Sequence, residues 1–286
     1  MILAGLSLFP MRFRGALIAG FAGFILPKIP NLRRRLMQNL DLIYPGIPRS
    51  KKLTIATEVV SNSARSLSEL LMNKEFRTRQ DLFEASGPGL SVLQRAKEEG
   101  KGAIIVSAHF GQWEAIRHVL KEQDMETGAV YRENTNPFYE KLFLKNIRMG
   151  GEPIVARGMA GNKAMLKHLR NGGFFALLVD QKVHQDEVLP FLGKPAMTTT
   201  SPAHMALKFG IPLVPAFATR NKNGQTIDIE FQEPIENGDP LDMTMEINHR
   251  LEEKIRENPG QWYWLHKRWE LPTGMQVNEK FADQVI

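Results

Sequence analysis

One histidine and one glutamate follow an apolar segment directly, and their types and spacing make them the first candidates for chemistry. Residues 102–106 read GAIIV, and residues 107–116 read SAHFGQWEAI, which includes His109 and Glu114. Imidazole is the most frequent general base in proteins, and a neighbouring carboxylate fixes its tautomer and stabilises its protonated form. We therefore expect a polar site where this apolar segment ends.

The five-residue spacing restricts how this pair can meet. On one continuous helix His109 and Glu114 would point about 140° apart, because each residue turns about 100°. We predict that His109 lies in a loop and Glu114 in the first turn of the next helix, where the two side chains converge. The alternatives are a histidine that only completes local hydrogen bonds and a pair of metal ligands, although the spacing is not that of H-E-x-x-H zinc sites. With no serine or cysteine placed as a nucleophile, the substrate's own hydroxyl is the expected one.

The elements that must position this pair alternate along the chain. Apolar strand patterns at residues 102–108, 127–132, 152–156, 174–180, 211–219 and 226–231 are separated by helical patterns. This alternation predicts an α/β fold with a mostly parallel central sheet flanked by helices. His109 then follows the carboxyl end of a strand, where open α/β sheets bind ligands. A helix expected to begin at Gly111 would direct free N–H groups to an anion at the same place.

The first forty residues differ in composition from the rest of the chain. The net charge is +6, and residues 1–40 contain six basic residues and no acidic one. The apolar runs at 1–9 and 15–26 are shorter than the roughly 20 residues of a membrane span. We predict that residues 1–40 form a surface-lying membrane anchor in which PNLRRR (30–35) meets anionic lipid, with no nucleic-acid partner. The alternative is a buried N-terminal helix. Residues 41–286 would form the α/β domain, with a helical lead-in at 41–100.

The absence of cysteine from the sequence excludes several kinds of chemistry. The chain has no disulfide, no thiol nucleophile and no cysteine-bound metal. Its 43% hydrophobic and 24% charged residues are ordinary for a globular protein, which argues against a disordered chain or a polytopic membrane protein.

Five segments resemble one known family. SAHFGQWE is similar to the H-x4-D/E motif of glycerolipid acyltransferases, in the glutamate form typical of the lipid A biosynthesis (late) acyltransferases of the lauroyl and myristoyl type. VYRENTNP (130–137), LLVDQ (177–181), residues 191–220 and PGQWYWLHKRW (259–269) resemble further blocks in family order. The resemblance extends from about Leu32 to Trp269. The chain departs from the family where Pro10, Arg12 and Arg14 interrupt the N-terminal apolar run.

The resemblance implies an enzyme that moves a fatty acyl chain from acyl carrier protein to a hydroxyl of a lipid A precursor. The work would occur at the cytoplasmic face of a bacterial inner membrane. His109 would be the general base and Glu114 its orienting partner. Arg132 would hold a phosphate or the charge that grows on the thioester carbonyl, and Asp180 and Gln181 would contact a sugar or headgroup.

The same residues have simpler interpretations. Arg132 could form a surface salt bridge with Glu133 or Glu140, and Asp180 could cap a turn. Trp264 is interpreted as a packing residue, on the face opposite Trp262 if the segment is extended.

The expected reaction is a direct transfer without a covalent enzyme intermediate. Backbone N–H groups near Gly111 or Arg132 would hold the oxyanion. No metal or bound cofactor is expected, and acyl carrier protein or coenzyme A would carry the acyl chain as co-substrate. A lysophospholipid, glycolipid or aminolipid acceptor is the alternative within the same chemistry. A non-catalytic membrane-binding protein and a metal hydrolase are the alternatives outside it.

Overall fold

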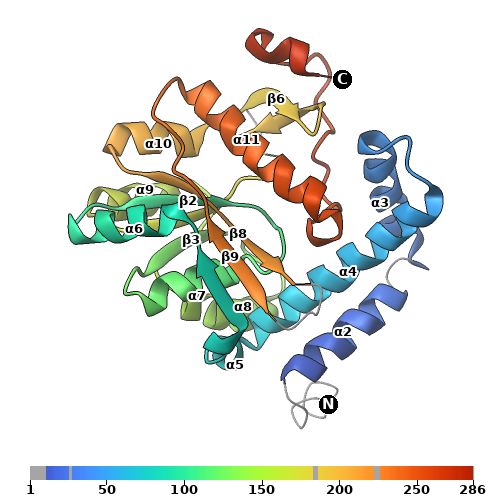
Figure 1. Ribbon diagram of the computed structural model, residues 1–286, viewed down its shortest axis with the longest axis horizontal. Coiled ribbons are helices and arrows are strands. Elements are labelled where there is room, and N and C mark those ends of the chain that lie inside the picture. Colours follow the sequence, from blue (N-terminus) through green and yellow to red (C-terminus); the bar gives the residue numbers. More distant parts are fainter. Residues whose placement is uncertain (1–10, 26–27, 183–185, 222–225, 286) are drawn as a thin grey trace.

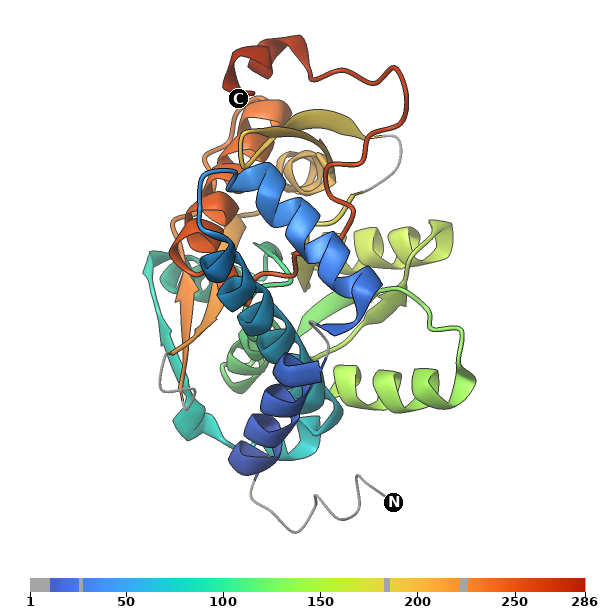
Figure 2. The ribbon, with the colours of Figure 1, turned by 90° about the vertical axis from the view of Figure 1, so that its right-hand side faces the viewer.

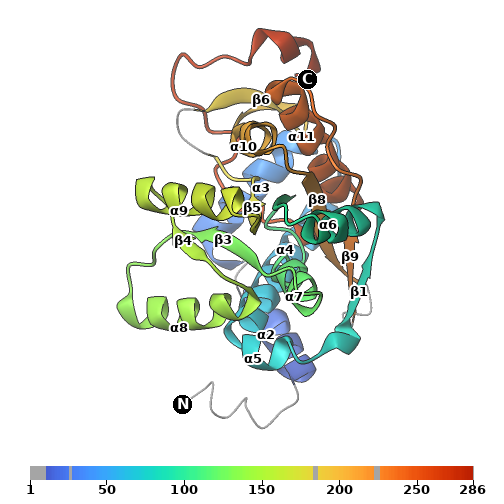
Figure 3. The same ribbon diagram turned by 90° about the vertical axis from the view of Figure 1, so that its left-hand side faces the viewer.

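The computed structural model describes residues 11–25, 28–182, 186–221 and 226–285. Seven of the described strands form one sheet in the order β1-β9-β8-β2-β5-β3-β4, and two more form a hairpin (Figure 1). Figure 3 shows β4 and β1 at the two edges of the sheet. The strands are β1 Phe83–Ser86, β2 Ala103–Ser107, β3 Thr127–Tyr131, β4 Ile154–Ala156, β5 Phe174–Leu178, β6 Glu187–Phe191, β7 Lys194–Thr198, β8 Leu213–Arg220 and β9 Ile227–Phe231.

Strand β2 lies at the centre, between β5 and β8, and is parallel to both. All five of its residues are buried. Successive side chains of a strand point to opposite faces, and Ile104 and Val106 accordingly belong to one core cluster, while Ala103 and Ile105 belong to the other. A strand buried on both faces reads as a continuous apolar run, as GAIIV does.

Helices cover both faces of the sheet. Residues of α9, α10 and α11 share a core cluster with Ile104, and residues of α6 and α7 share one with Ile105. The described α-helices are α2 Met11–Ile25, α3 Pro30–Ile43, α4 Arg49–Leu71, α5 Asn73–Phe76, α6 Pro88–Glu98, α7 Glu114–Glu122, α8 Pro137–Ile147, α9 Met159–Arg170, α10 Ser201–Phe209 and α11 Pro240–Glu257. Short 3-10 helices are η2 Gln80–Leu82, η3 Arg148–Gly150, η4 Pro259–Gln261 and η5 Glu279–Gln284.

The N-terminal helix α2 lies along α4, as Figures 1 and 2 show. Its small residues face α4: Ala22 is buried, and Ser61 of α4 donates a hydrogen bond to the carbonyl of Ala19 at 3.0 Å. Its large residues Phe21 and Phe24 are 69% and 68% exposed. Within the described ranges no single helix has the length and apolar composition to span a membrane. Only α2 and α3 together pass that test, and they are bent by 87°.

The predicted fold class is confirmed, and the differences are local. The sequence does not predict β1 or the β6–β7 hairpin, which fall in segments expected to be irregular. Strand β9 alternates like an edge strand but lies between β8 and β1. The helix after β2 begins at Glu114 rather than Gly111, because Gly111 adopts a left-handed conformation with φ of 53°.

Candidate functional site

The site is built at the carboxyl ends of the adjacent strands β2 and β5. Ser107 pairs with Leu178 at the end of this parallel register, so the chains that continue from both strands leave the sheet side by side. His109 and Asp180 meet there. The Nδ1 atom of His109 lies 2.8 Å from Oδ1 of Asp180, and the His109 backbone N–H donates to Oδ2 at 2.9 Å.

Asp180 is held as a buried carboxylate. Its residue exposure is 2%, and the indole Nε1–H of Trp262 also donates to Oδ2, at 2.9 Å. Burial raises the pKa of Asp180, but the positive charge of His109 and the hydrogen bonds from His109 and Trp262 outweigh it, so the pKa lies below its ordinary value. The charged form is therefore the one that the fold stabilises.

The His109 side chain remains partly accessible to solvent. It is 24% exposed, and the rings of Trp113 and Tyr263 lie 5.4 and 6.2 Å from its ring. The amide nitrogen of Gln181 lies 3.4 Å from Nδ1 and 3.3 Å from Nε2. In the ring plane an atom this close to both nitrogens would collide with the carbon between them, so the amide lies over the ring face.

A third segment, residues 261–263 at the end of η4, holds the loop that carries His109 through backbone hydrogen bonds. The Gly111 N–H donates to the carbonyl of Gln261 at 2.9 Å, and the Tyr263 N–H donates to the carbonyl of His109 at 3.0 Å. Phe110 and Trp262 form an antiparallel bridge between these bonds. The Gly111 N–H, expected to face an anion, is therefore already engaged within the protein.

Helix α4 contacts the same loop through polar side chains. Ser66 donates to the carbonyl of Gly111 at 2.7 Å, and Gln112 donates to Oε2 of Glu69 at 2.6 Å. Arg220, at the end of β8, donates to the same Glu69 oxygen at 2.6 Å. Glu69 and Arg220 are both buried. This network joins α4, the His109 loop and β8 through polar side chains.

The predicted contact between Glu114 and His109 is not found. Glu114 is the first residue of α7, and its Oε1 accepts a short hydrogen bond from Arg117, one turn later. Arg117 also donates to the carbonyls of Thr127, Ile147 and Gly151. Burial raises the pKa of Glu114, and the charge and hydrogen bond of Arg117 oppose that rise. The expected pair is not formed because α7 starts at Glu114, which places its carboxylate toward η3. The carboxylate beside the imidazole is that of Asp180, which follows β5.

Arg132 is exposed at the carboxyl end of β3, and β5 lies between β3 and the His109 strand. The described residues give it no hydrogen bond or ion pair. Glu140, one alternative partner, binds Tyr131 at 2.7 Å and the backbone and side chain of Asn134 instead. Among the described residues Arg132 is therefore an unpaired cation on the same edge of the sheet, outside the contacts of the His109–Asp180 pair.

Two further titratable groups lie near the pair. The pKa of His266 is lowered to about 4, and burial is the largest cause. The charge of Asp180 raises this pKa, while the charges of Arg268, His109 and Arg157 lower it. Burial likewise lowers the pKa of Arg268 to about 10, against the charge of Asp180. Arg268 uses its terminal nitrogens on Met197 and Thr198. It acts on Asp180 through space, without a hydrogen bond.

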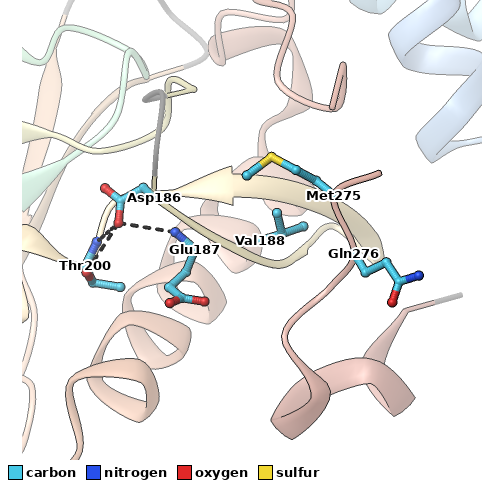
Figure 4. A pocket seen from close by; sticks show the side chains of 6 residues that line it. All are labelled: Asp186, Glu187, Val188, Thr200, Met275 and Gln276. Atoms are coloured by element: carbon cyan, nitrogen blue, oxygen red, sulfur yellow. Dashed lines mark hydrogen bonds between the residues drawn. The ribbon is translucent and has the colours of Figure 1, made fainter. Parts of the chain in front are cut away.

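A cavity of about 490 Å³ lies elsewhere, beside β6 (Figure 4). Its Asp186 carboxylate accepts hydrogen bonds from the Thr200 and Glu187 backbones and from the Thr200 hydroxyl. None of its lining side chains hydrogen-bonds to His109 or Asp180 within the part of the chain described. Across the same residues no group of three or more His, Asp or Glu could hold a metal ion. The pair at β2 and β5 is therefore where we place the site.

Sequence reasoning found His109, Asp180 and Gln181 but missed what joins them. From the sequence, Trp262 is placed only in the segment 259–269 that resembles a family block, and Trp264 is expected on the opposite face of an extended segment. The chain turns after Trp262, so both indoles lie in one buried cluster with ring centroids 4.8 Å apart. Ser66 and Glu69 lie on α4, in the segment that the sequence predicts only as a helical lead-in. Polar residues at core-facing positions were the signal that could have revealed them.

A histidine paired with a buried carboxylate, at the carboxyl edge of an open α/β sheet, is an arrangement suited to general acid–base chemistry. The comparisons with known proteins identify the class. The family model described as bacterial lipid A biosynthesis acyltransferase matches residues 1–270, so the chain belongs to this family and is an acyltransferase.

Among its relatives, the lipid A biosynthesis acyltransferase of Haemophilus influenzae is 23% identical over 91% of this chain and 82% of its own. The lipid A biosynthesis lauroyltransferase of Escherichia coli is 24% identical over 83% and 79%. The phosphatidylinositol mannoside acyltransferase of Mycobacterium tuberculosis is 22% identical over 63% and 58%.

Proposed function

We propose that this protein transfers a fatty acyl chain from an acyl carrier protein thioester to a hydroxyl of a lipid A precursor, at the cytoplasmic face of a bacterial inner membrane. The observation that carries the proposal is the 2.8 Å contact between His109 and the buried Asp180, in a chain that matches the family over residues 1–270. Relatives named for lipid A biosynthesis support the choice of acceptor.

In this mechanism His109 is the general base and Asp180 its orienting partner. Because Asp180 is a carboxylate, it accepts a hydrogen from Nδ1 and leaves the lone pair of Nε2 to take the proton of the acceptor hydroxyl. The hydroxyl oxygen attacks the thioester carbonyl carbon, and a tetrahedral oxyanion forms. Its collapse breaks the carbon–sulfur bond, and the imidazolium returns the proton to the leaving thiolate.

Backbone groups at the start of α7 are suited to hold the oxyanion. Within the described chain the N–H groups of Trp113 and Glu114 donate to no other backbone or side-chain acceptor, unlike those of Gly111 and Gln112. They lie at the positive end of α7, where negative charge is stabilised. The Glu114 side chain then has a structural role, because its contact with Arg117 fixes the first turn of α7. Arg132 would hold a phosphate of the acceptor.

The charge and the N-terminal helix support the remaining partners. A net charge of +6 favours an acidic carrier protein and anionic lipid. Helix α2 packs on α4 with one face and leaves Leu17 and Phe21 exposed on the other. An apolar face of this kind suits a helix that lies in the headgroup region of a membrane. This arrangement combines the two N-terminal alternatives, since one face is packed and the other is free.

A glycolipid other than a lipid A precursor is the second candidate acceptor. The similarity to a phosphatidylinositol mannoside acyltransferase, over 185 residues, favours it specifically. Both acceptors are anionic glycolipids that offer a hydroxyl, and the proposed chemistry is the same for both.

An acyl-transfer assay with a matched variant tests the proposal. Purified protein in detergent is incubated with acyl carrier protein thioesters and either a lipid A precursor or a phosphatidylinositol mannoside, and products are followed by mass spectrometry. We expect one added acyl chain on the lipid A precursor. In His109→Ala the rate should fall about a hundredfold or more, the usual contribution of a general base. Product on the mannoside alone would replace the acceptor, and full activity in His109→Ala would refute the mechanism.

A further inference from the structure

The Asp180 carboxylate depends on a donor that lies far from it in the sequence. We propose that Trp262 is a positioning residue of this acyltransferase, whose indole N–H holds the Asp180 carboxylate in the orientation that serves His109. The inference rests on the proposed role of His109 as general base. It assigns to the C-terminal segment a part in the chemistry beyond packing.

The hydrogen bonds to Asp180 fix the carboxylate at both oxygens. Oδ1 contacts Nδ1 of His109 at 2.8 Å, while Oδ2 accepts from Nε1 of Trp262 at 2.9 Å and from the His109 backbone at 2.9 Å. Rotation of the carboxylate about its Cβ–Cγ bond would break these bonds together. The Asp180 carboxylate therefore orients the imidazole, and the indole N–H of Trp262 holds that carboxylate at its other oxygen.

The donor is rigid. Trp262 is 1% exposed, and its ring packs against Trp264, Phe191 and Trp269 with centroids 4.8, 5.7 and 5.9 Å away. Its backbone bridges to Phe110, the residue after His109. One residue thus ties the histidine loop through its main chain and the aspartate through its side chain.

The chemistry of indole suits this position. Its N–H can only donate, whereas a hydroxyl could turn its hydrogen to another acceptor and an amide could turn its oxygen toward the carboxylate. A buried carboxylate is costly unless its oxygens are satisfied. Arg268 lies close enough to influence Asp180 but bonds to Met197 and Thr198. Among the described side chains, Trp262 is therefore the donor to Asp180 other than His109 itself.

The same aromatic cluster supplies two matched controls. Trp264 is also buried, but its Nε1 donates to the carbonyl of Pro259 at 2.7 Å. Trp269 donates to the carbonyl of Phe191 at 3.0 Å. A change of Trp to Phe at each position removes a similar volume and one hydrogen bond from one cluster. Only the change at Trp262 removes a hydrogen bond to the catalytic pair.

The experiment measures kcat, KM and the pH dependence of kcat/KM for Trp262→Phe, Trp264→Phe and Trp269→Phe, with denaturation curves for all three. We expect kcat of Trp262→Phe to fall about tenfold or more with KM little changed, as expected for one lost hydrogen bond to a charged group. The two controls should stay within about threefold, a change that corresponds to much less than one such bond.

The pH profile provides a readout that loss of packing would not move. Without the indole donor, negative charge concentrates on the oxygens of Asp180 and stabilises protonated His109. The rising limb of kcat/KM should therefore move to higher pH in Trp262→Phe and remain in place in the controls. The other titratable groups that act on the pair, His266 and Arg268, are the same in all variants.

Each outcome decides the matter. If the three variants lose activity equally, or the pH midpoint of Trp262→Phe is unchanged, Trp262 is a packing residue and the inference fails. If Trp262→Phe does not fold, replacement of Trp262 by 3-benzothienylalanine keeps the two rings and exchanges the N–H for sulfur, and the same kinetic criteria apply. Full activity of His109→Ala would refute the proposed base itself, a result distinct from equality among the tryptophan variants.

Discussion

At the scale of single residues, Gly111 sets the path of the backbone in the His109 loop. Its φ of 53° is left-handed, and a Cβ placed there would lie 1.9 Å from the carbonyl oxygen of Ala218. A side chain is thus disfavoured both by the backbone conformation and by the neighbouring strand. The loop can pass close to β8 only because this position carries no Cβ.

Gly111→Ala should therefore lose both stability and activity. We expect at least about 3 kcal/mol of destabilisation, from the left-handed conformation plus the forced movement of the backbone, and a loss of acyl transfer of about tenfold or more. Gly210→Ala is the matched control, because Gly210 has φ of 59° but open space around its Cβ position. It should cost about 1 kcal/mol and leave activity intact. Equal effects in denaturation and transfer assays would contradict the close-approach argument.

The residues of the site could be predicted from the sequence, but their pairing could not. His109 and Asp180 each follow an apolar strand, which places both at the carboxyl edge. They are 71 residues apart, and β3 and β4 lie between them in the chain but not in the sheet. Only strand order makes Asp180 the neighbour of His109. Glu114 is the nearest carboxylate in sequence, and its i,i+3 spacing to Arg117 favours a helical ion pair without excluding a contact with His109.

At the scale of elements, α4 does more than bury an apolar stripe. Its last turns carry Ser66 and Glu69, which hold the loop through Gly111 and Gln112. Glu69 also balances the charge of the buried Arg220 and pairs with Arg65 at 3.2 Å. The position of the His109 loop thus depends on a buried charged network between a lead-in helix and the sheet.

Glu69→Gln should destabilise the protein strongly although it preserves size. Removal of one partner leaves Arg220 buried without its counter-charge, which costs about 3 kcal/mol or more in comparable networks. Glu75→Gln is the control, because the Glu75 side chain, which pairs with Arg14, is 45% exposed. Exposed ion pairs contribute about 1 kcal/mol or less. Urea denaturation of both variants measures the difference. A Glu69→Gln curve that overlays Glu75→Gln would show that the network is not stabilising.

The helices and parallel strands were predictable because each carries its own hydrophobic period, whereas β1 and the β6–β7 hairpin were not. Strand β1 is four residues long and mostly exposed, so it has no buried face to reveal a period. The hairpin includes Pro190 and Pro195, which face each other in its register. Proline reads as a strand breaker in sequence, and tertiary packing overrides that signal here.

At the scale of the whole molecule, the chain places its most exposed N-terminal apolar side chains on one helix. Phe13, Leu17, Phe21 and Phe24 of α2 are each at least half exposed, while Ala22 faces α4. In Figure 1 α2 and α10 lie at opposite ends of the molecule. In the proposed function a lipid acceptor reaches His109 from a bilayer, and α2 offers a surface that would hold the enzyme against one.

Leu17→Ser should accordingly weaken binding to vesicles that contain an anionic phospholipid by about tenfold, and Phe21→Ser by a similar factor, since burying such a side chain contributes about 1.5–3 kcal/mol. Leu207→Ser on α10 is the matched control, also at an exposed leucine, and should bind like the unchanged protein. Vesicle flotation measures all three.

Acyl transfer to a detergent-solubilised acceptor should stay normal in the α2 variants, because their side chains lie outside the His109 loop, while transfer to acceptor embedded in vesicles should fall with binding. Weakened binding in Leu207→Ser to the same extent would show that apolar surface in general, rather than α2, contacts the membrane.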